Sequence, residues 1–181
     1  MSRPSQVAVL AEDDRHQGFV RRYLYRLGHS RHDIRFEPLP SGRGCGEQWV
    51  RERYAQAVRA YRARSARAGT ALIIAIDADA GDADRRLRQL REALEQAGLA
   101  TRTDGEAIVH LIPKWSVETW ILCLSGRQVD EITDYSQEGD VDRLIPTAAL
   151  TFFEWTRVNA TPPARCVPSL LSAIPEVRRL E

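Results

Sequence analysis

Two apolar runs that stop abruptly at carboxylates constrain this fold more than any other feature. The first covers residues 7–11 and is followed at once by three acids at 12–14. The second covers residues 71–76 and is followed by Asp77 and Asp79. Short, continuous apolar runs are typical of buried parallel strands. The acids then lie at the carboxyl ends of strands, where open α/β sheets bind their ligands.

The rest of the pattern alternates between strands and helices. Glycines follow several of the helical segments, as they do where helices end. Further strands are predicted over 33–39 and 107–112, and helices over 17–27, 47–68, 82–96 and 116–124. This β-α-β-α-β-α-β-α order predicts an α/β fold, with a mainly parallel sheet flanked by helices.

The chain is long enough for one domain with a substantial core, or a domain with an appendage. We expect an α/β domain over 1–125 and a short helical extension over 126–181 that packs on it. In that extension the pattern predicts a helix over 146–158, a proline-rich connector over 159–168 and a helix over 169–180.

Composition excludes several classes of protein. No apolar run approaches the roughly 18 residues that span a membrane, and the N-terminus lacks a secretory signal pattern, so we expect a cytoplasmic protein. The 3 cysteines (Cys45, Cys123, Cys166) are far apart, which argues against a disulfide framework and a zinc site. The 4 histidines show no metal-ligand spacing; His16 and His110 fit ordinary helix-start and strand positions.

The net charge of +1 is unevenly distributed. A local basic face is enough to contact nucleic-acid phosphates, although each cluster is equally compatible with a solvated helix face. The basic clusters are Arg51, Arg53, Arg59, Arg62, Arg64 and Arg67, and Arg85, Arg86, Arg88 and Arg91.

The acids at the strand ends suggest a divalent-metal site. Asp77 and Asp79 are two residues apart and, in an extended segment, would point the same way. Glu12, Asp82 and Glu118 would reach the same rim from other segments. Carboxylates gathered there repel one another unless a cation neutralises them, and hard oxygen ligands suit Mg²⁺ or Mn²⁺.

This layout resembles the TOPRIM domain of topoisomerases, primases and OLD-family nucleases, over roughly residues 6–125. That family carries a glutamate after its first strand, here Glu12, and an Asp-x-Asp after its third, here Asp77 and Asp79. The glycine loop around Arg43 and the segment 113–118 look like small OLD-like TOPRIM proteins of mobile elements and phage defence. In OLD-like nucleases a further glutamate helps to hold a second metal, and Glu118 is the candidate.

The resemblance implies a nuclease that hydrolyses phosphodiester bonds in DNA or RNA with Mg²⁺ or Mn²⁺. Asp77 and Asp79 would bind one ion, and Glu12 would act as ligand or general base. Arg43 or Lys114 would neutralise the phosphate in the transition state.

Alternatives remain open. One alternative is a non-catalytic or partner-activated subunit that works with a separate ATPase, since the chain has no GxxxxGK[ST] loop of its own. Others are transfer of nucleotidyl or phosphoryl groups on a small nucleotide, and a receiver-type domain. Individually, Asp13, Asp79 and Asp82 would serve as helix caps, Glu118 would favour its helix dipole, and Trp115 and Trp120 would pack in the core or at its rim.

Overall fold

The computed structural model describes residues 3–40, 46–65, 69–79 and 82–181. These residues form one four-stranded sheet in which every neighbouring pair of strands is parallel. The strand order is β2-β1-β3-β4. The strands are β1 (Gln6–Ala11), β2 (Ile34–Phe36), β3 (Thr70–Ala75) and β4 (Ile108–Leu111). The predicted α/β class, with a parallel sheet flanked by helices, is confirmed.

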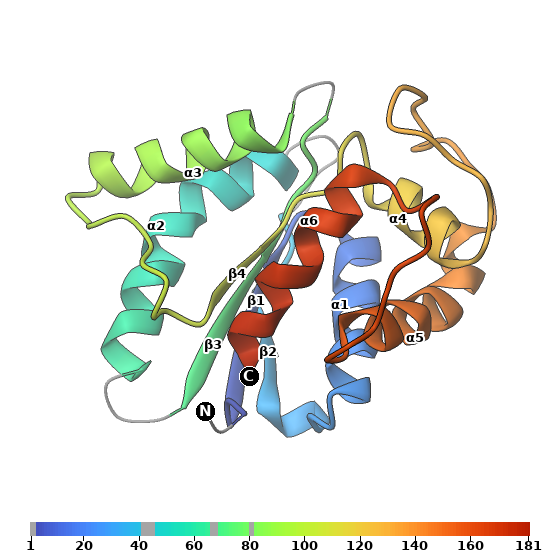
Figure 1. Ribbon diagram of the computed structural model, residues 1–181. Coiled ribbons are helices and arrows are strands. Elements are labelled where there is room, and N and C mark those ends of the chain that lie inside the picture. The colour runs from blue at the N-terminus through green and yellow to red at the C-terminus, as the bar shows by residue number, and fades with distance from the viewer. Residues whose placement is uncertain (1–2, 41–45, 66–68, 80–81) are drawn as a thin grey trace.

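Helices cover both faces of the sheet (Figure 1). One face carries α2 (Gly46–Ser65) and α3 (Ala83–Gln96). The other carries α1 (Asp14–Arg26), α4 (Val117–Leu124), α5 (Ile145–Thr156) and α6 (Pro168–Val177). Short 3₁₀ helices are η1 (Arg31–Asp33), η2 (Val141–Leu144) and η3 (Arg178–Leu180). None of the helices in the described part of the chain is long and apolar enough to cross a membrane.

Burial on both faces explains why the strands read as continuous apolar runs. Successive side chains of a strand point to opposite faces. In β1, Val7 and Val9 therefore join the core under α1, and Leu10 joins the core under α2 and α3. All three side chains are fully buried, so positions on both faces of β1 favour apolar residues.

The strand order creates a topological switch point beside β1. From β1 the chain passes through α1 to β2, on one side, and then through α2 to β3, on the other. These two connections diverge at the carboxyl ends of β1 and β3, which is the usual position of the ligand site in open α/β sheets.

Several element boundaries differ from the prediction, and two of these differences have a clear physical cause. The first helix begins at Asp14 instead of residue 17, because the Asp13 carboxylate accepts a hydrogen bond from the His16 N–H at 2.8 Å and caps it. The second strand is shorter than predicted and ends at Phe36. Glu37 still donates to the Val9 carbonyl at 2.9 Å, but Pro38 has no N–H with which to continue.

Residues 126–181 share the core on the α1 face of the sheet. Phe152 of α5 is fully buried, with ring centroids 5.5 Å from Phe19, 4.9 Å from Tyr23 and 6.3 Å from Trp120. The Trp120 indole donates to Ser169 Oγ, at the start of α6, at 2.7 Å. Trp120 is therefore a core residue.

Candidate functional site

Glu12 and Asp77 meet at the switch point. Glu12 directly follows β1, and its N–H continues the sheet ladder by donating to the Ala75 carbonyl at 3.0 Å. Its Oε2 accepts a hydrogen bond from the Asp77 N–H at 2.9 Å. Both residues follow the carboxyl ends of adjacent parallel strands, so the sheet itself brings them together.

His16 bridges two acids at this point. Its ring is almost completely buried, with Nδ1 2.8 Å from Asp13 Oδ1 and Nε2 3.0 Å from Asp77 Oδ1. The sequence predicts only an ordinary helix-start position for His16. The sequence signal for its role was weak: an acid three residues earlier, at a capping position. Its contact with Asp77 joins segments 61 residues apart and has no local signature.

Burial and close charges shift the pKa values of this group. Burial raises the pKa of Asp77 to about 7, against the lowering effect of His16. Burial also raises the pKa of Glu12, and the charges of Asp79 and Asp13 add to that rise. For His16, burial lowers the pKa, but Asp77 and Asp13 together raise it well above its ordinary value. The site therefore retains protons that the same groups would lose in water.

Asp13 shifts in the opposite direction. Burial would raise its pKa, but the hydrogen bond and charge of His16, together with backbone N–H donors, hold it at about 2. Asp13 is therefore a fixed negative charge at neutral pH, and it orients the imidazole toward Asp77.

Asp79 contacts a different cation from Asp77. Its backbone has φ of 52°, and its Oδ2 accepts from Arg86 Nη2 at 2.8 Å. Arg86, buried in α3, also donates from Nε to the Asp77 carbonyl at 2.8 Å and forms an ion pair with Glu47. Because β3 ends at Ala75, the 77–79 segment is not a regular strand, and its two carboxylates lie against His16 and Arg86 respectively.

Asp82 and Glu118 have other partners in this structure. Asp82 is the N-cap of α3 and accepts from the Arg85 N–H at 2.5 Å. Glu118 lies buried in the first turn of α4 and forms an ion pair with Arg15 Nη1. Arg15 Nε is also 3.0 Å from Asp142 Oδ1, so this guanidinium joins α1, α4 and η2.

Lys114 lies beside the 77–79 segment. The next residue, Trp115, donates its N–H to the Asp79 carbonyl at 3.2 Å and has φ of 65°. Within the described residues the Lys114 ammonium forms no hydrogen bond or ion pair, and the Lys114 N–H donates to Ser169 Oγ at 3.2 Å. Trp115 is half-buried and donates its indole N–H to the Glu131 carbonyl at 3.1 Å. The predicted phosphate contact Arg43 lies outside the described residues.

Gly46 allows α2 to begin against Glu12. A Cβ at this position would lie 2.6 Å from the Glu12 carbonyl oxygen and 2.6 Å from its Cγ, closer than any side chain permits. Glycine is therefore required for this close approach. The sequence predicts a glycine loop over 41–46, and its pattern contains no signal for contact between Gly46 and the acidic edge.

The acids are neutralised largely by the protein's own cations: His16 beside Asp77, Arg86 beside Asp79 and Arg15 beside Glu118. Across residues 3–40, 46–65, 69–79 and 82–181, no three His, Cys, Asp or Glu side chains gather in a form that could hold a metal ion. Asp77 Oδ1 is buried and lies 3.0 Å from His16 Nε2. The carboxylates of Asp77 and Glu12 are the candidates to accept a cation at the switch point.

Comparisons with protein-family models, with curated proteins and with solved structures found no match for this chain.

Proposed function

We propose that this protein hydrolyses phosphodiester bonds in nucleic acid with the help of Mg²⁺ or Mn²⁺. One observation carries the proposal: the half-buried Glu12 and the buried Asp77 meet at the switch point of the sheet, where Glu12 accepts from the Asp77 N–H, and burial raises the pKa of both. Perturbed carboxylates at such a position are typical of catalytic centres. The TOPRIM-like order of these acids along the chain supports the same reaction.

Each acid would have a distinct role in the proposed reaction. Glu12 and Asp77 would hold the metal ion, joined by Asp79 once it leaves Arg86. A bound ion lowers the pKa of water and neutralises charge on the phosphate. In the alternative role of general base, Glu12 would not bind the ion, and its raised pKa would suit it to accept the proton of the attacking water.

Two basic residues complete the arrangement. Arg86 fixes the backbone that carries Asp77 through its 2.8 Å bond to the Asp77 carbonyl. Lys114, beside Asp79 and free of ion pairs in the described structure, is placed to neutralise a phosphate oxygen.

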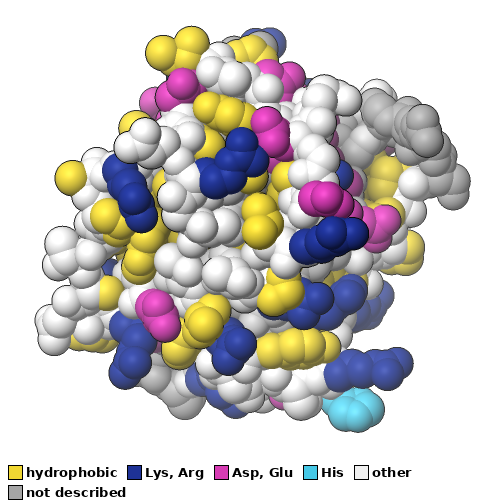
Figure 2. Space-filling view, turned by 90° about the vertical axis from the view of Figure 1, so that its right-hand side faces the viewer, with side chains coloured by type: hydrophobic (Ala, Val, Ile, Leu, Met, Phe, Trp, Pro, Cys, Tyr) yellow, Lys and Arg dark blue, Asp and Glu magenta, His cyan; other side chains and the backbone are white. Residues whose placement is uncertain are grey.

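The charge distribution fits a polyanionic substrate. Figure 2 shows Asp and Glu mainly in the upper half of one face and Lys and Arg mainly in the lower half. The upper end is the one at which the carboxyl ends of the strands lie (Figure 1). A substrate could thus contact basic groups away from the acids that perform the reaction.

The test is a cleavage assay on plasmid, oligonucleotide and RNA with Mn²⁺. Asp77→Asn removes a charge at the centre with little change in shape, and we expect it to abolish cleavage. Asp84→Asn is the matched control, because Asp84 is an exposed acid in the first turn of α3. Metal-dependent cleavage that persists in Asp77→Asn would refute the assignment.

A second candidate is a subunit that becomes active only with a partner, for example an ATPase. It is favoured by the ion pairs that occupy Asp79 and Glu118, because these acids must be released before they can bind an ion. Cleavage by the purified chain alone would argue against this candidate. Inactivity of the chain alone, followed by activity with an added partner, would favour it.

A further inference from the structure

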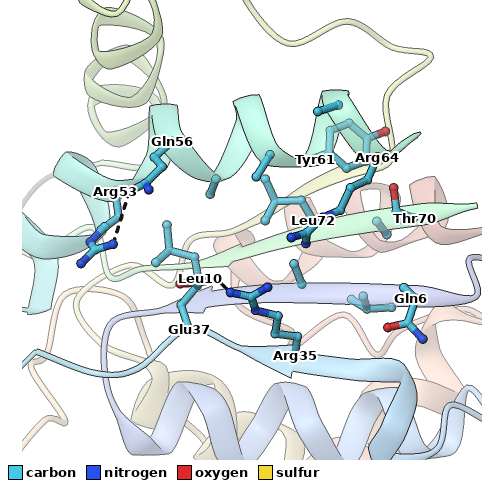
Figure 3. A pocket seen from close by; sticks show the side chains of 16 residues that line it. Gln6, Leu10, Arg35, Glu37, Arg53, Gln56, Tyr61, Arg64, Thr70 and Leu72 are labelled. Carbon is cyan, nitrogen blue, oxygen red and sulfur yellow. Dashed lines mark hydrogen bonds and ion pairs between the residues drawn. The ribbon is translucent and has the colours of Figure 1, made fainter. Parts of the chain in front are cut away.

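A hollow of about 720 Å³ lies between α2 and the edge of the sheet, apart from the acidic centre (Figure 3). It forms because α2 packs on β1 and β3, while β2 lies beyond it at the edge of the sheet. A second hollow of about 480 Å³ shares Arg35, Glu37 and Arg53 with the first and continues it toward Trp49. Together they form a groove along the strands, of a size typical of ligand sites.

The floor of this groove is apolar. Leu10 and Leu72 are fully buried beneath it, and the accessible lining is made of Ala8 of β1 and Ala57 and Ala60 of α2. These small side chains leave open space beside the helix, with no polar group of their own to satisfy. An occupant can therefore place flat apolar surface against them.

The walls of the groove are basic. Arg53 and Arg64 of α2 are 11 residues apart, which places them on one face of the helix, and Arg35 of β2 stands opposite. Glu37 is the one acid in the lining, and its 3.5 Å pair with Arg35 is exposed and therefore weak. Three guanidiniums against one carboxylate favour an anionic occupant.

These arginines keep donors available. Arg53 donates to Gln56 at 3.3 Å and lies 5.7 Å from the centre of the Trp49 ring. The Arg64 side chain makes no hydrogen bond or ion pair with the described residues. By contrast, the neighbouring Arg62 forms an ion pair with Glu106 at 2.6 Å, so its guanidinium already has a partner within the protein.

We propose that this groove binds a single strand of nucleic acid and leads it toward the acidic centre. The inference rests on the proposed function and names the form of its substrate. A single strand exposes both its phosphates and its base faces, which suit basic walls, an apolar floor and the Trp49 ring. A duplex keeps its bases stacked inside and could not offer them to the floor. Near Trp49, the first turn of α2 carries Gly46, which abuts Glu12.

The test measures binding without metal, so it does not depend on cleavage. Fluorescence anisotropy with labelled single-stranded and duplex oligonucleotides in EDTA, at several salt concentrations, gives affinity and salt dependence. We expect Arg35→Ala/Arg53→Ala/Arg64→Ala to weaken single-strand binding at least tenfold. Losing three phosphate contacts would also reduce the slope of log K against log salt by about 2.

The matched control is Arg22→Ala/Arg88→Ala/Arg91→Ala, which removes the same charge from exposed helix positions outside the groove. Its affinity should stay within about threefold of wild type by the same salt argument. Equal losses in the two triple variants would overturn the proposal. So would duplex binding as tight as single-strand binding, or tighter binding of an acidic peptide of equal charge.

A second variant tests whether the open space of the groove, and not only its charge, is needed for single-strand binding. Ala60→Trp fills the groove without changing charge, at an exposed helix position that tolerates a large side chain. We expect it to weaken single-strand binding at least tenfold, with wild-type thermal unfolding as the check on folding. Unchanged affinity would overturn the groove as the binding surface. Failure of Asp77→Asn to abolish cleavage would instead contradict the proposed function and leave this result intact.

Discussion

Buried charged residues define this molecule at the scale of single side chains. His16, Asp77, Arg86 and Glu118 are all nearly inaccessible to solvent. Burying a charge is costly unless a partner compensates it, and each of these residues has such a partner. They gather at the carboxyl end of the sheet, as the proposed centre requires.

His110 provides a prediction away from that centre. Its ring is buried in β4, with Nε2 2.9 Å from the Tyr54 hydroxyl. Burial lowers its pKa to about 3, and the charge of Arg102 lowers it further, although Glu176 opposes the shift. The unfolded chain binds this proton near pH 6.5, so stability from neutral His110 is complete above pH 6.5 and is lost as the pH falls toward 3.

His110→Gln can still bond to Tyr54 but cannot titrate. We expect urea unfolding of this variant to depend less on pH, with a slope smaller than that of wild type by up to about 1.4 kcal/mol per pH unit below pH 6.5. Measurements at pH 5, 6, 7 and 8 give this difference. Parallel pH curves for the two proteins would show that His110 is not buried in its neutral form.

At the scale of elements, helix starts do much of the positioning. Asp13 begins α1 and orients His16, Gly46 begins α2 against Glu12, and Asp82 begins α3. Each of these residues is at the start of the helix that follows a strand in the chain. The same residues therefore begin the helices and position the side chains of the acidic edge.

Asp82 can be assigned to capping or to metal binding by substitution. Asp82→Ala removes the acceptor for the Arg85 N–H and should cost about 0.5–2 kcal/mol in free energy of unfolding. Asp82→Ser keeps a capping oxygen and should restore most of that loss. Because Asp82 caps α3, we expect Mn²⁺ affinity to be the same in both variants and in wild type. Stability unchanged by Asp82→Ala, with loss of Mn²⁺ binding, would assign it to the metal instead.

Local sequence patterns predicted the positions of helices and strands better than they predicted which side chains contact one another. The apolar runs at 7–11 and 71–76 and the glycines after helices marked the strands and helices, because these signals depend only on near neighbours. The positions of Glu12 and Asp77 followed from parallel pairing. The partners His16 and Arg86 could not be predicted, since their contacts depend on how α1 and α3 pack against the sheet.

At the scale of the whole molecule, the two parts expected from the sequence share one core. Residues of β1, β3, β4, α1, α4, α5 and α6 belong to the same apolar cluster on one face of the sheet. Arg15 adds a polar link from α1 to Glu118 and Asp142. Residues 126–181 should therefore unfold together with residues 1–125.

Phe152→Ala tests this coupling. The ring contributes to both parts through its contacts with Phe19, Tyr23 and Trp120, so its loss should cost about 3–5 kcal/mol. We expect a single thermal transition, at a lower temperature, seen equally by far-ultraviolet circular dichroism and by tryptophan fluorescence. Two separate transitions would contradict a shared core.

The proposed reaction depends most on a divalent cation bound at the acidic edge. The direct measurement is Mn²⁺ titration by calorimetry on wild type, Asp77→Asn and the control Asp84→Asn. We predict binding by wild type and by the control, and affinity at least tenfold weaker in Asp77→Asn, because a carboxylate proposed to hold the ion has lost its charge. Equal binding by all three proteins, or binding by none, would contradict a metal centre at Glu12 and Asp77.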